Sequence, residues 1–188
     1  MVLESNEFLT RLNLKATCIE PDIVIPMIRA NKTRLVELNL SSNSEKFTKK
    51  GKALIEALGK NTSLITLNLS DNPFDWSDVS FIPLESNKSL ENLDLSSCNL
   101  TPKTVERLRK FLITSKNLKS LNFSSNNLAF QERIISEILA KNKSLRILNL
   151  SSNKISSYRY RYNMVRALKL NNLAEAIKKN KTLRKLDL

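Results

Sequence analysis

The chain has 188 residues with no histidine, two cysteines, two glycines and a formal net charge of +13. Without histidine the chain lacks the commonest general base and metal ligand. Two cysteines far apart in the sequence cannot build a thiolate metal site. Two glycines are too few for a phosphate-binding loop or a dinucleotide-binding motif. We therefore expect no enzyme, no cofactor and no metal site.

The net positive charge of the chain comes entirely from its second half. Residues 1–94 hold 11 Lys and Arg against 13 Asp and Glu, a net charge of −2, whereas residues 95–188 hold 20 against 5, a net charge of +15. A field of one sign over one end of the molecule attracts an acidic partner and speeds encounter. The alternative is that these cations only solubilise the outer helices.

A nine-residue pattern, L-x-x-L-x-L-x-x-N, recurs along the sequence, and residues 145–153 are its clearest copy. Each copy predicts a short strand in which the leucines at positions 4 and 6 point inward. The seven strands are expected to start at Leu9, Leu35, Leu64, Leu90, Leu118, Leu145 and Leu183, which are 26, 29, 26, 28, 27 and 38 residues apart. Units of this period stack into a solenoid.

The segments between the strands predict helices in units two, four and five. Apolar residues at helical spacing are expected to be buried there: Leu54, Ile55 and Leu58; Val105, Leu108 and Leu112; and Ile135, Ile138 and Leu139. Thr101 followed by Pro102 predicts the N-cap and the first residue of the helix in unit four. Gly59 is expected to end the helix in unit two.

Three units depart from the common length. Unit two has about two extra residues, so Phe47 rather than Glu45 is expected to fill the apolar slot. Unit three is short, and Pro83 is expected to break its helix. Unit six is about ten residues longer than the others and holds all three tyrosines of the chain. Insertions in repeat proteins lie in loops on one face, often the face that binds.

These units resemble leucine-rich repeats, and lengths near 28 with both a strand and a helix resemble the ribonuclease-inhibitor subclass. The resemblance implies one α/β solenoid domain over residues 1–188, with parallel strands on the concave face and helices on the convex face. It also implies a non-catalytic module that covers the surface of a partner protein and in some cases inhibits an enzyme. The Lys-, Asn-, Ser- and Ile-rich composition resembles leucine-rich repeat effectors of intracellular bacterial pathogens, which implies delivery into a host cytosol and a host protein or companion effector as partner.

The ninth position of each unit predicts a structural ladder. Its side chains are expected to bond backbone groups of neighbouring turns; they are Thr17, Asn43, Asn72, Cys98, Asn126 and Asn153. Cys98 is therefore interpreted as a ladder residue and not as a catalytic thiol. Asp94 and Asn122 occupy one strand position in adjacent units, and we expect them to have a structural role as well.

Binding is expected at the exposed strand positions 2 and 3, which vary from unit to unit. Along the chain they change from mixed and apolar, through one acidic residue, to basic. The predicted partner-binding residues here are Glu91, Lys119, Arg146, Arg184 and Lys185, and the predicted partner is a protein with an acidic patch. The rival interpretation is binding of nucleic acid or an anionic membrane through the basic half. It is the weaker one, because the sequence contains no recognisable groove-reading helix or base-stacking surface.

Two aromatic sites are further candidates for partner binding. The insertion in unit six contains Tyr158, Arg159, Tyr160, Arg161 and Tyr162. Tyrosine and arginine are enriched in interface hot spots, although the same run also fits the first turn of a lengthened helix. Trp76 in unit three is either an exposed anchor or packs on Phe74 or Phe81.

The sequence also predicts a cytoplasmic protein. Residues 1–8 contain no basic start followed by an apolar run, and no stretch is long enough to span a membrane. Cys18 and Cys98 lie three strands apart, about 14 Å at roughly 4.8 Å per strand, which exceeds the roughly 7 Å that a disulfide allows. Asn39, Asn68, Asn122 and Asn149 start N-x-S sequons on predicted strands, where glycans would cover one face. Both terminal units look incomplete, so we expect either a fragment or a small protein whose ends are covered by contact.

Overall fold

Seven short strands form one parallel sheet in which the strand order follows the chain. The computed structural model describes residues 6, 8–30, 34–128, 131–153 and 163–188. The strands are β1 (Arg11–Asn13), β2 (Glu37–Asn39), β3 (Thr66–Asn68), β4 (Asn92–Asp94), β5 (Ser120–Asn122), β6 (Ile147–Asn149) and β7 (Lys185–Asp187). The register pairs the same position of every unit, so that Leu38 lies between Leu12 and Leu67.

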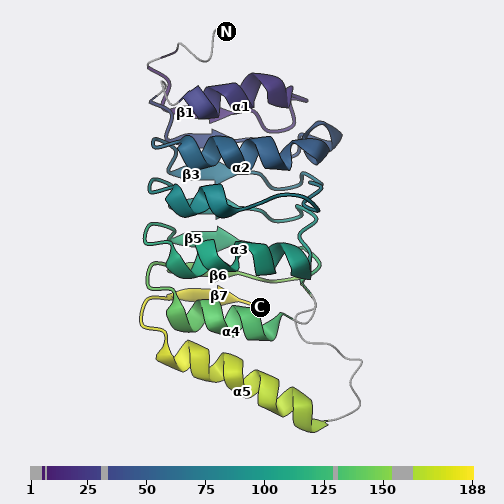
Figure 1. Ribbon diagram of the computed structural model, residues 1–188, viewed down its shortest axis with the longest axis vertical. Coiled ribbons are helices and arrows are strands. Elements are labelled where there is room, and N and C mark those ends of the chain that lie inside the picture. The colour runs from purple at the N-terminus through teal and green to yellow at the C-terminus, as the bar shows by residue number, and fades with distance from the viewer. Residues whose placement is uncertain (1–5, 7, 31–33, 129–130, 154–162) are drawn as a thin grey trace.

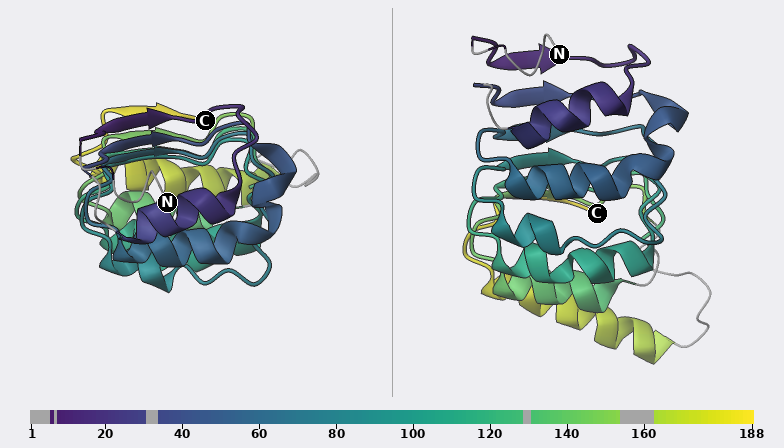
Figure 2. Two further views of the ribbon diagram at one scale, coloured as in Figure 1. Left: turned by 90° about the horizontal axis from the view of Figure 1, so that it is seen from above. Right: turned by 45° about the horizontal axis from the view of Figure 1, so that its top comes forward.

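The connections between the strands place helices on one side of the sheet (Figure 1). They are α1 (Pro21–Ala30), α2 (Gly51–Lys60), α3 (Pro102–Thr114), α4 (Glu132–Lys141) and α5 (Asn163–Lys179), with the 3-10 helices η1 (Ser44–Lys50) and η2 (Ile82–Ser86) in units two and three. Figure 2 shows the strands and the helices as two layers when the stack is seen from above. The helices spread farther along the stack than the strands in Figure 1, so the sheet lines the inner, concave side. The predicted α/β leucine-rich repeat solenoid is confirmed.

The core is a continuous stripe of leucine between the two layers. The leucines in the middle of β2 to β6 are at most 4% exposed. Burial of one such side chain contributes about 1.5–3 kcal/mol. In the two outer strands the corresponding residues, Leu12 and Leu186, are only partly buried. Each unit therefore depends on its neighbours for the burial of its leucines.

The helices begin and pack largely where the sequence predicts. The Thr101 hydroxyl accepts a hydrogen bond from the Thr104 backbone N–H at 3.3 Å, and Pro102 is the first residue of α3. All nine apolar residues predicted for units two, four and five are buried: Leu54, Ile55, Leu58, Val105, Leu108, Leu112, Ile135, Ile138 and Leu139. Phe47 fills the slot in unit two and is fully buried. Pro83 lies in the first turn of η2, which stays a five-residue 3-10 helix.

The prediction that Gly59 ends a helix is wrong. The helix α2 continues through Gly59 to Lys60, and Asn61 caps it. A Cβ atom on Gly59 would lie 2.6 Å from Cβ of Pro83 and 2.7 Å from its carbonyl oxygen. Glycine is therefore needed at position 59 because η2 packs closely against α2 there. It is not needed for a left-handed conformation at the end of the helix.

Candidate binding surface

The ninth-position ladder joins neighbouring turns by hydrogen bonds. The Asn72 side chain donates from Nδ2 to the carbonyl oxygens of Leu40 and Leu69 at 2.9 and 2.8 Å, and its Oδ1 accepts from the Asn43 backbone N–H at 2.9 Å. Asn43, Asn126 and Asn153 donate in the same way to carbonyl oxygens of their own and the preceding unit. These bonds satisfy backbone groups that water cannot reach.

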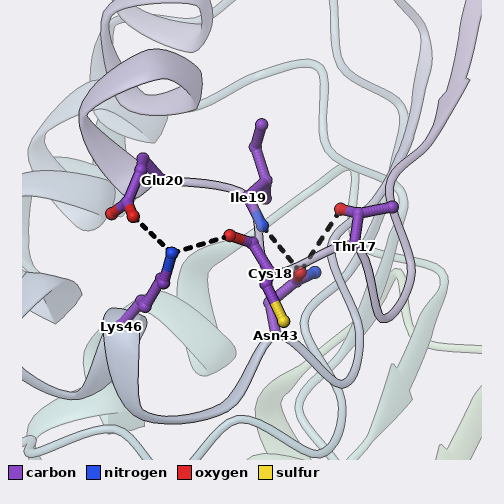
Figure 3. A network of polar contacts seen from close by, with 6 residues as sticks. All are labelled: Thr17, Cys18, Ile19, Glu20, Asn43 and Lys46. Carbon is purple, nitrogen blue, oxygen red and sulfur yellow. Dashed lines mark hydrogen bonds and ion pairs between the residues drawn. The ribbon is translucent and has the colours of Figure 1, made fainter.

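Thr17 begins this ladder in unit one (Figure 3). Its hydroxyl donates to Oδ1 of Asn43 at 3.4 Å, and the Ile19 backbone N–H donates to the same oxygen at 3.2 Å. Lys46 lies beside it, donating from Nζ to the Cys18 carbonyl oxygen at 3.0 Å and pairing with Glu20. This first turn is therefore tied to unit two by both side chain and backbone.

Cys98 occupies the ladder position of unit four. Its Sγ lies 3.0 Å from the Leu69 carbonyl oxygen, and its backbone N–H donates to Oδ1 of Asn126 at 3.0 Å. Burial raises the pKa of the Cys98 thiol to about 12, so the sulfur keeps its proton at neutral pH. A nucleophilic cysteine needs the thiolate, and this environment opposes its formation. Both cysteines are free, and Cys18 is exposed.

A second asparagine ladder, which sequence reasoning missed, closes the turns before β3, β4, β6 and β7. Its members are Asn61, Asn87, Asn142 and Asn180, with Ser115 at the equivalent place in unit four. In Asn142, for example, Nδ2 donates to the Leu112 carbonyl oxygen of the previous helix at 2.7 Å. Its Oδ1 accepts from the backbone N–H groups of Ser144 and Leu145 at 2.8 and 2.7 Å. The signal in the sequence is Asn-x-Ser/Thr-Leu, with the leucine opening each strand.

The concave face is a shallow trough with a mostly polar floor. Its C-terminal part is a hollow of about 340 Å³ that reaches from β3 to β7, and a second hollow of about 410 Å³ lies over β1 to β3. The floor asparagines bond their own turns, as in Asn39, whose Oδ1 accepts from the Ser41 backbone N–H at 3.0 Å. Asp94 accepts from Asn122 Nδ2 at 3.0 Å and from the Ser96 hydroxyl at 2.7 Å. Ile147 is an exposed apolar side chain on this face, at 41%.

Three of the predicted binding residues meet at the edge where the chain enters the strands. The backbone N–H of Arg146 donates to the Lys119 carbonyl oxygen, and that of Arg184 to the Arg146 carbonyl oxygen, both at 2.7 Å. The three residues are therefore direct neighbours, each immediately before one of three consecutive strands. Lys119 also pairs with Glu91, with 2.6 Å between Nζ and Oε1. Lys185 lies apart from this edge, on the concave floor, where it pairs with Asp187.

Sequence reasoning missed three further cations at the same edge. Together with Lys119, Arg146 and Arg184 they line a hollow of about 380 Å³; they are Lys116, Lys143 and Lys181. These six residues are called the basic edge. The second ladder sets its geometry, because Ser115, Asn142 and Asn180 fold the turns that carry the lysines. The turns lie along the left side of the stack in Figure 1. A Lys three residues before a Lys or Arg, in three successive units, is the signal in the sequence.

Ion pairing separates the basic edge from cations on the helices. Arg109 pairs with Glu106 and Glu137, and Lys141 with Glu137. Hydrogen bonds from Lys141 and Arg109 lower the pKa of Glu137, and the bond to Glu137 raises the pKa of Arg109. At the basic edge, Lys119 alone has an acidic partner among the described residues. Five cations without an acidic partner among the described residues therefore lie together where the chain enters β5 to β7.

The structure overturns the prediction that Trp76 is an exposed anchor. Trp76 is 3% exposed and packs between Phe74 and Phe81, with ring centroids 4.5 and 5.6 Å away. Its indole Nε1 donates to the Cys98 carbonyl oxygen at 2.8 Å. The alternative interpretation, packing on the two phenylalanines, describes the side chain correctly. Tyr158, Arg159, Tyr160, Arg161 and Tyr162 lie outside the described residues.

Comparison with protein families identifies the repeats. One model of the leucine-rich repeat matches residues 60–76, 86–108 and 141–157, and a second leucine-rich repeat model matches residues 117–141. These matches cover strands β3, β4, β5 and β6 and agree with the observed units. No helix in the described ranges is long and apolar enough to cross a membrane.

Two mammalian proteins are similar to this chain in sequence. Human NACHT, LRR and PYD domains-containing protein 13 is 33% identical over 132 residues, which are 67% of this chain and 12% of that protein. Rat capping protein, Arp2/3 and myosin-I linker protein 3 is 30% identical over 144 residues, which are 71% of this chain and 10% of that protein. The chain thus spans about a tenth of the length of these relatives.

A solved structure shares the fold. The C-terminal domain of tropomodulin from Caenorhabditis elegans superposes with a TM-score of 0.55 at 18% identity, covering 89% of this chain and 81% of that one. At this identity the likeness concerns the fold alone.

Proposed function

Because this chain is an α/β solenoid of leucine-rich repeats, we propose that it is a non-catalytic module that binds another protein with its concave face and basic edge. The proposed partner presents an acidic patch to the C-terminal part of the solenoid. The observation that carries the proposal is the row of Lys119, Arg146 and Arg184, each immediately before one of three consecutive strands. Of these three cations, Arg146 and Arg184 have no acidic partner among the described residues.

The arrangement supplies what protein recognition needs. The concave floor contributes exposed Ile147 next to the cations, and Glu91 gives the N-terminal end of the row an opposite charge. Complementary charge raises the association rate and sets the orientation of a partner, and apolar contacts beside it add affinity. A polar floor made of asparagines that bond their own turns contributes shape more than energy.

The relatives support the class of function. The name of the rat relative describes a linker of capping protein, Arp2/3 and myosin-I, which are protein partners. The strand-and-helix units support the ribonuclease-inhibitor-like subclass. Enzyme inhibition, a bacterial effector role and a cytoplasmic location stay predictions from the sequence, and the mammalian relatives lend the effector role no support.

The test compares two charge-reversal variants as baits for proteins from a lysate. Arg146→Glu with Arg184→Glu reverses two cations of the basic edge. Arg133→Glu with Lys178→Glu reverses two exposed cations of α4 and α5 and changes the net charge equally. We expect one or more proteins to be retained by the wild type and the helix variant and lost by the edge variant.

Titration of such a protein, once purified, completes the test. We expect the edge variant to bind at least about tenfold more weakly and with a smaller salt dependence, because charge reversal turns attraction into repulsion. Equal affinity of all three proteins would place the binding surface away from the basic edge. Retention of nucleic acid or anionic vesicles in place of any protein would favour the rival class.

A further inference from the structure

The basic edge gathers six cations around one hollow. The hollow has a volume of about 380 Å³, and among its described lining residues none is acidic. Glu91, just outside the hollow, neutralises Lys119 alone. Five cations are left without an acidic partner in the described part of the chain.

The backbone holds these cations together against their repulsion. The strand register fixes Lys119, Arg146 and Arg184 about 4.8 Å apart from strand to strand, as the two 2.7 Å backbone bonds require. The turns are also tied to one another, since the Ser144 hydroxyl donates to the Ser115 carbonyl oxygen at 2.8 Å. The backbone positions that carry the cations therefore cannot move apart unless the turns unfold, and an anion between the side chains would relieve their repulsion.

We propose that the basic edge is a binding site for a small polyphosphate, a ligand with two or three phosphate groups close together. This inference goes beyond the proposed function, because it concerns a ligand that binds the chain alone and needs no protein partner. A hollow of this volume has the size of a small-molecule site. Arginine offers phosphate a two-pronged contact, and lysine offers a mobile point charge.

Charge density favours phosphate over carboxylate. Each phosphate group brings a charge of about −1.5 to −2 and three acceptor oxygens, so three clustered phosphates match the five free cations. Three carboxylates in the same space bring only three charges. Single-stranded nucleic acid is disfavoured because base recognition uses aromatic stacking, and none of the described residues lining the hollow is aromatic. Clustered phosphates occur both in free polyphosphates and in phosphorylated lipid headgroups, and the experiment separates these sources.

The first measurement is isothermal titration of the chain with inorganic tripolyphosphate at about 0.15 M salt, where exposed charges are screened beyond about 8 Å. We expect saturable binding of one ligand per chain. Lys143→Gln with Arg184→Gln is expected to weaken it about tenfold or more, because two charge-assisted contacts are lost. The matched control is Arg133→Gln with Lys178→Gln, which removes the same charge from the helices and is expected to change the affinity less than about twofold.

Melting temperatures check that the variants fold. The substituted side chains are exposed, so circular dichroism of the free variants should match the wild type. Tripolyphosphate should raise the melting temperature of the wild type and of the helix variant but not of the edge variant, because only ligand binding to the folded state stabilises it. An equal rise in all three would overturn the assignment of the site.

Competing ligands decide the chemistry and its source. Citrate or hexaglutamate binding as tightly as tripolyphosphate would refute the preference for phosphate, and tighter binding of single-stranded RNA would assign the edge to nucleic acid instead. Vesicles of phosphatidylcholine with phosphatidylinositol bisphosphate identify a headgroup as the source if they bind with the same dependence on Lys143 and Arg184. Absence of saturable tripolyphosphate and vesicle binding would refute the proposal altogether.

Discussion

Replacing Asn72 by alanine should test whether the ninth-position ladder holds the solenoid together. Asn72 is fully buried, and its Oδ1 is the acceptor for the Asn43 backbone N–H at 2.9 Å. The carbonyl oxygens that lose its Nδ2 keep other donors, since Leu40 still accepts from Asn43 Nδ2 and Leu69 from Cys98 Sγ. The main loss of unfolding free energy, about 1–3 kcal/mol, comes from the buried Asn43 N–H, which is left without an acceptor. With the lost hydrogen bonds of the Asn72 amide group, the total loss is about 2–4 kcal/mol.

Urea unfolding followed by circular dichroism measures this free energy. The matched control is Asn92→Ala, because Asn92 is only half-buried and donates from Nδ2 to the Thr66 hydroxyl at 3.0 Å on the open face of the sheet. We expect the control to cost less than about 1 kcal/mol. If Asn72→Ala unfolds at the same urea concentration as Asn92→Ala, the ladder does not carry the stability assigned to it.

Three further substitutions and treatments follow from the structure. Gly59→Ala should lower the free energy of unfolding by about 1–3 kcal/mol, because its Cβ would overlap Pro83; an unchanged melting temperature would contradict the close approach of η2. Iodoacetamide at pH 8 should label Cys18 in the folded chain and leave Cys98 unmodified, because burial raises the pKa of the Cys98 thiol to about 12; two labels in the mass spectrum would count against this. Glu137 has a pKa below its usual 4.5, so its contribution to stability is complete above that pH and is lost as the pH falls through the folded-state value; Glu137→Gln should flatten the acid side of the stability profile, and an unaltered profile would show that its bonds to Lys141 and Arg109 do not matter.

The fold was predictable because the residues that determine each strand and helix lie within a single repeat. A strand with leucine at positions 4 and 6 buries the same side chains in every unit, and the cap formed by Thr101 and Pro102 acts within one helical turn. Gly59 was misjudged, and Trp76 was left between two alternatives, because a decisive partner of each lies in another unit. Pro83 crowds Gly59 from unit three, and Cys98 accepts from Trp76 across 22 residues.

The binding surface was predictable only in part, for a related reason. Arg146 and Arg184 stand immediately before strands, within the nine-residue pattern, where the position in the repeat already determines their neighbours. Lys143 and Lys181 stand in turns outside the nine-residue leucine pattern, and they reach the same edge because Asn142 and Asn180 fold those turns. The strand register places Lys119, Arg146 and Arg184, and the side-chain bonds of the second ladder bring three more lysines beside them.

Hydrogen–deuterium exchange of the chain, alone and with a protein captured through the basic edge, tests the central claim most directly. We expect protection in the turns at residues 115–118, 142–145 and 180–183 and along the face of β5 to β7. Protection confined to the outer helices α2, α3 and α4, with unchanged exchange at those turns, would contradict binding through the concave face and basic edge.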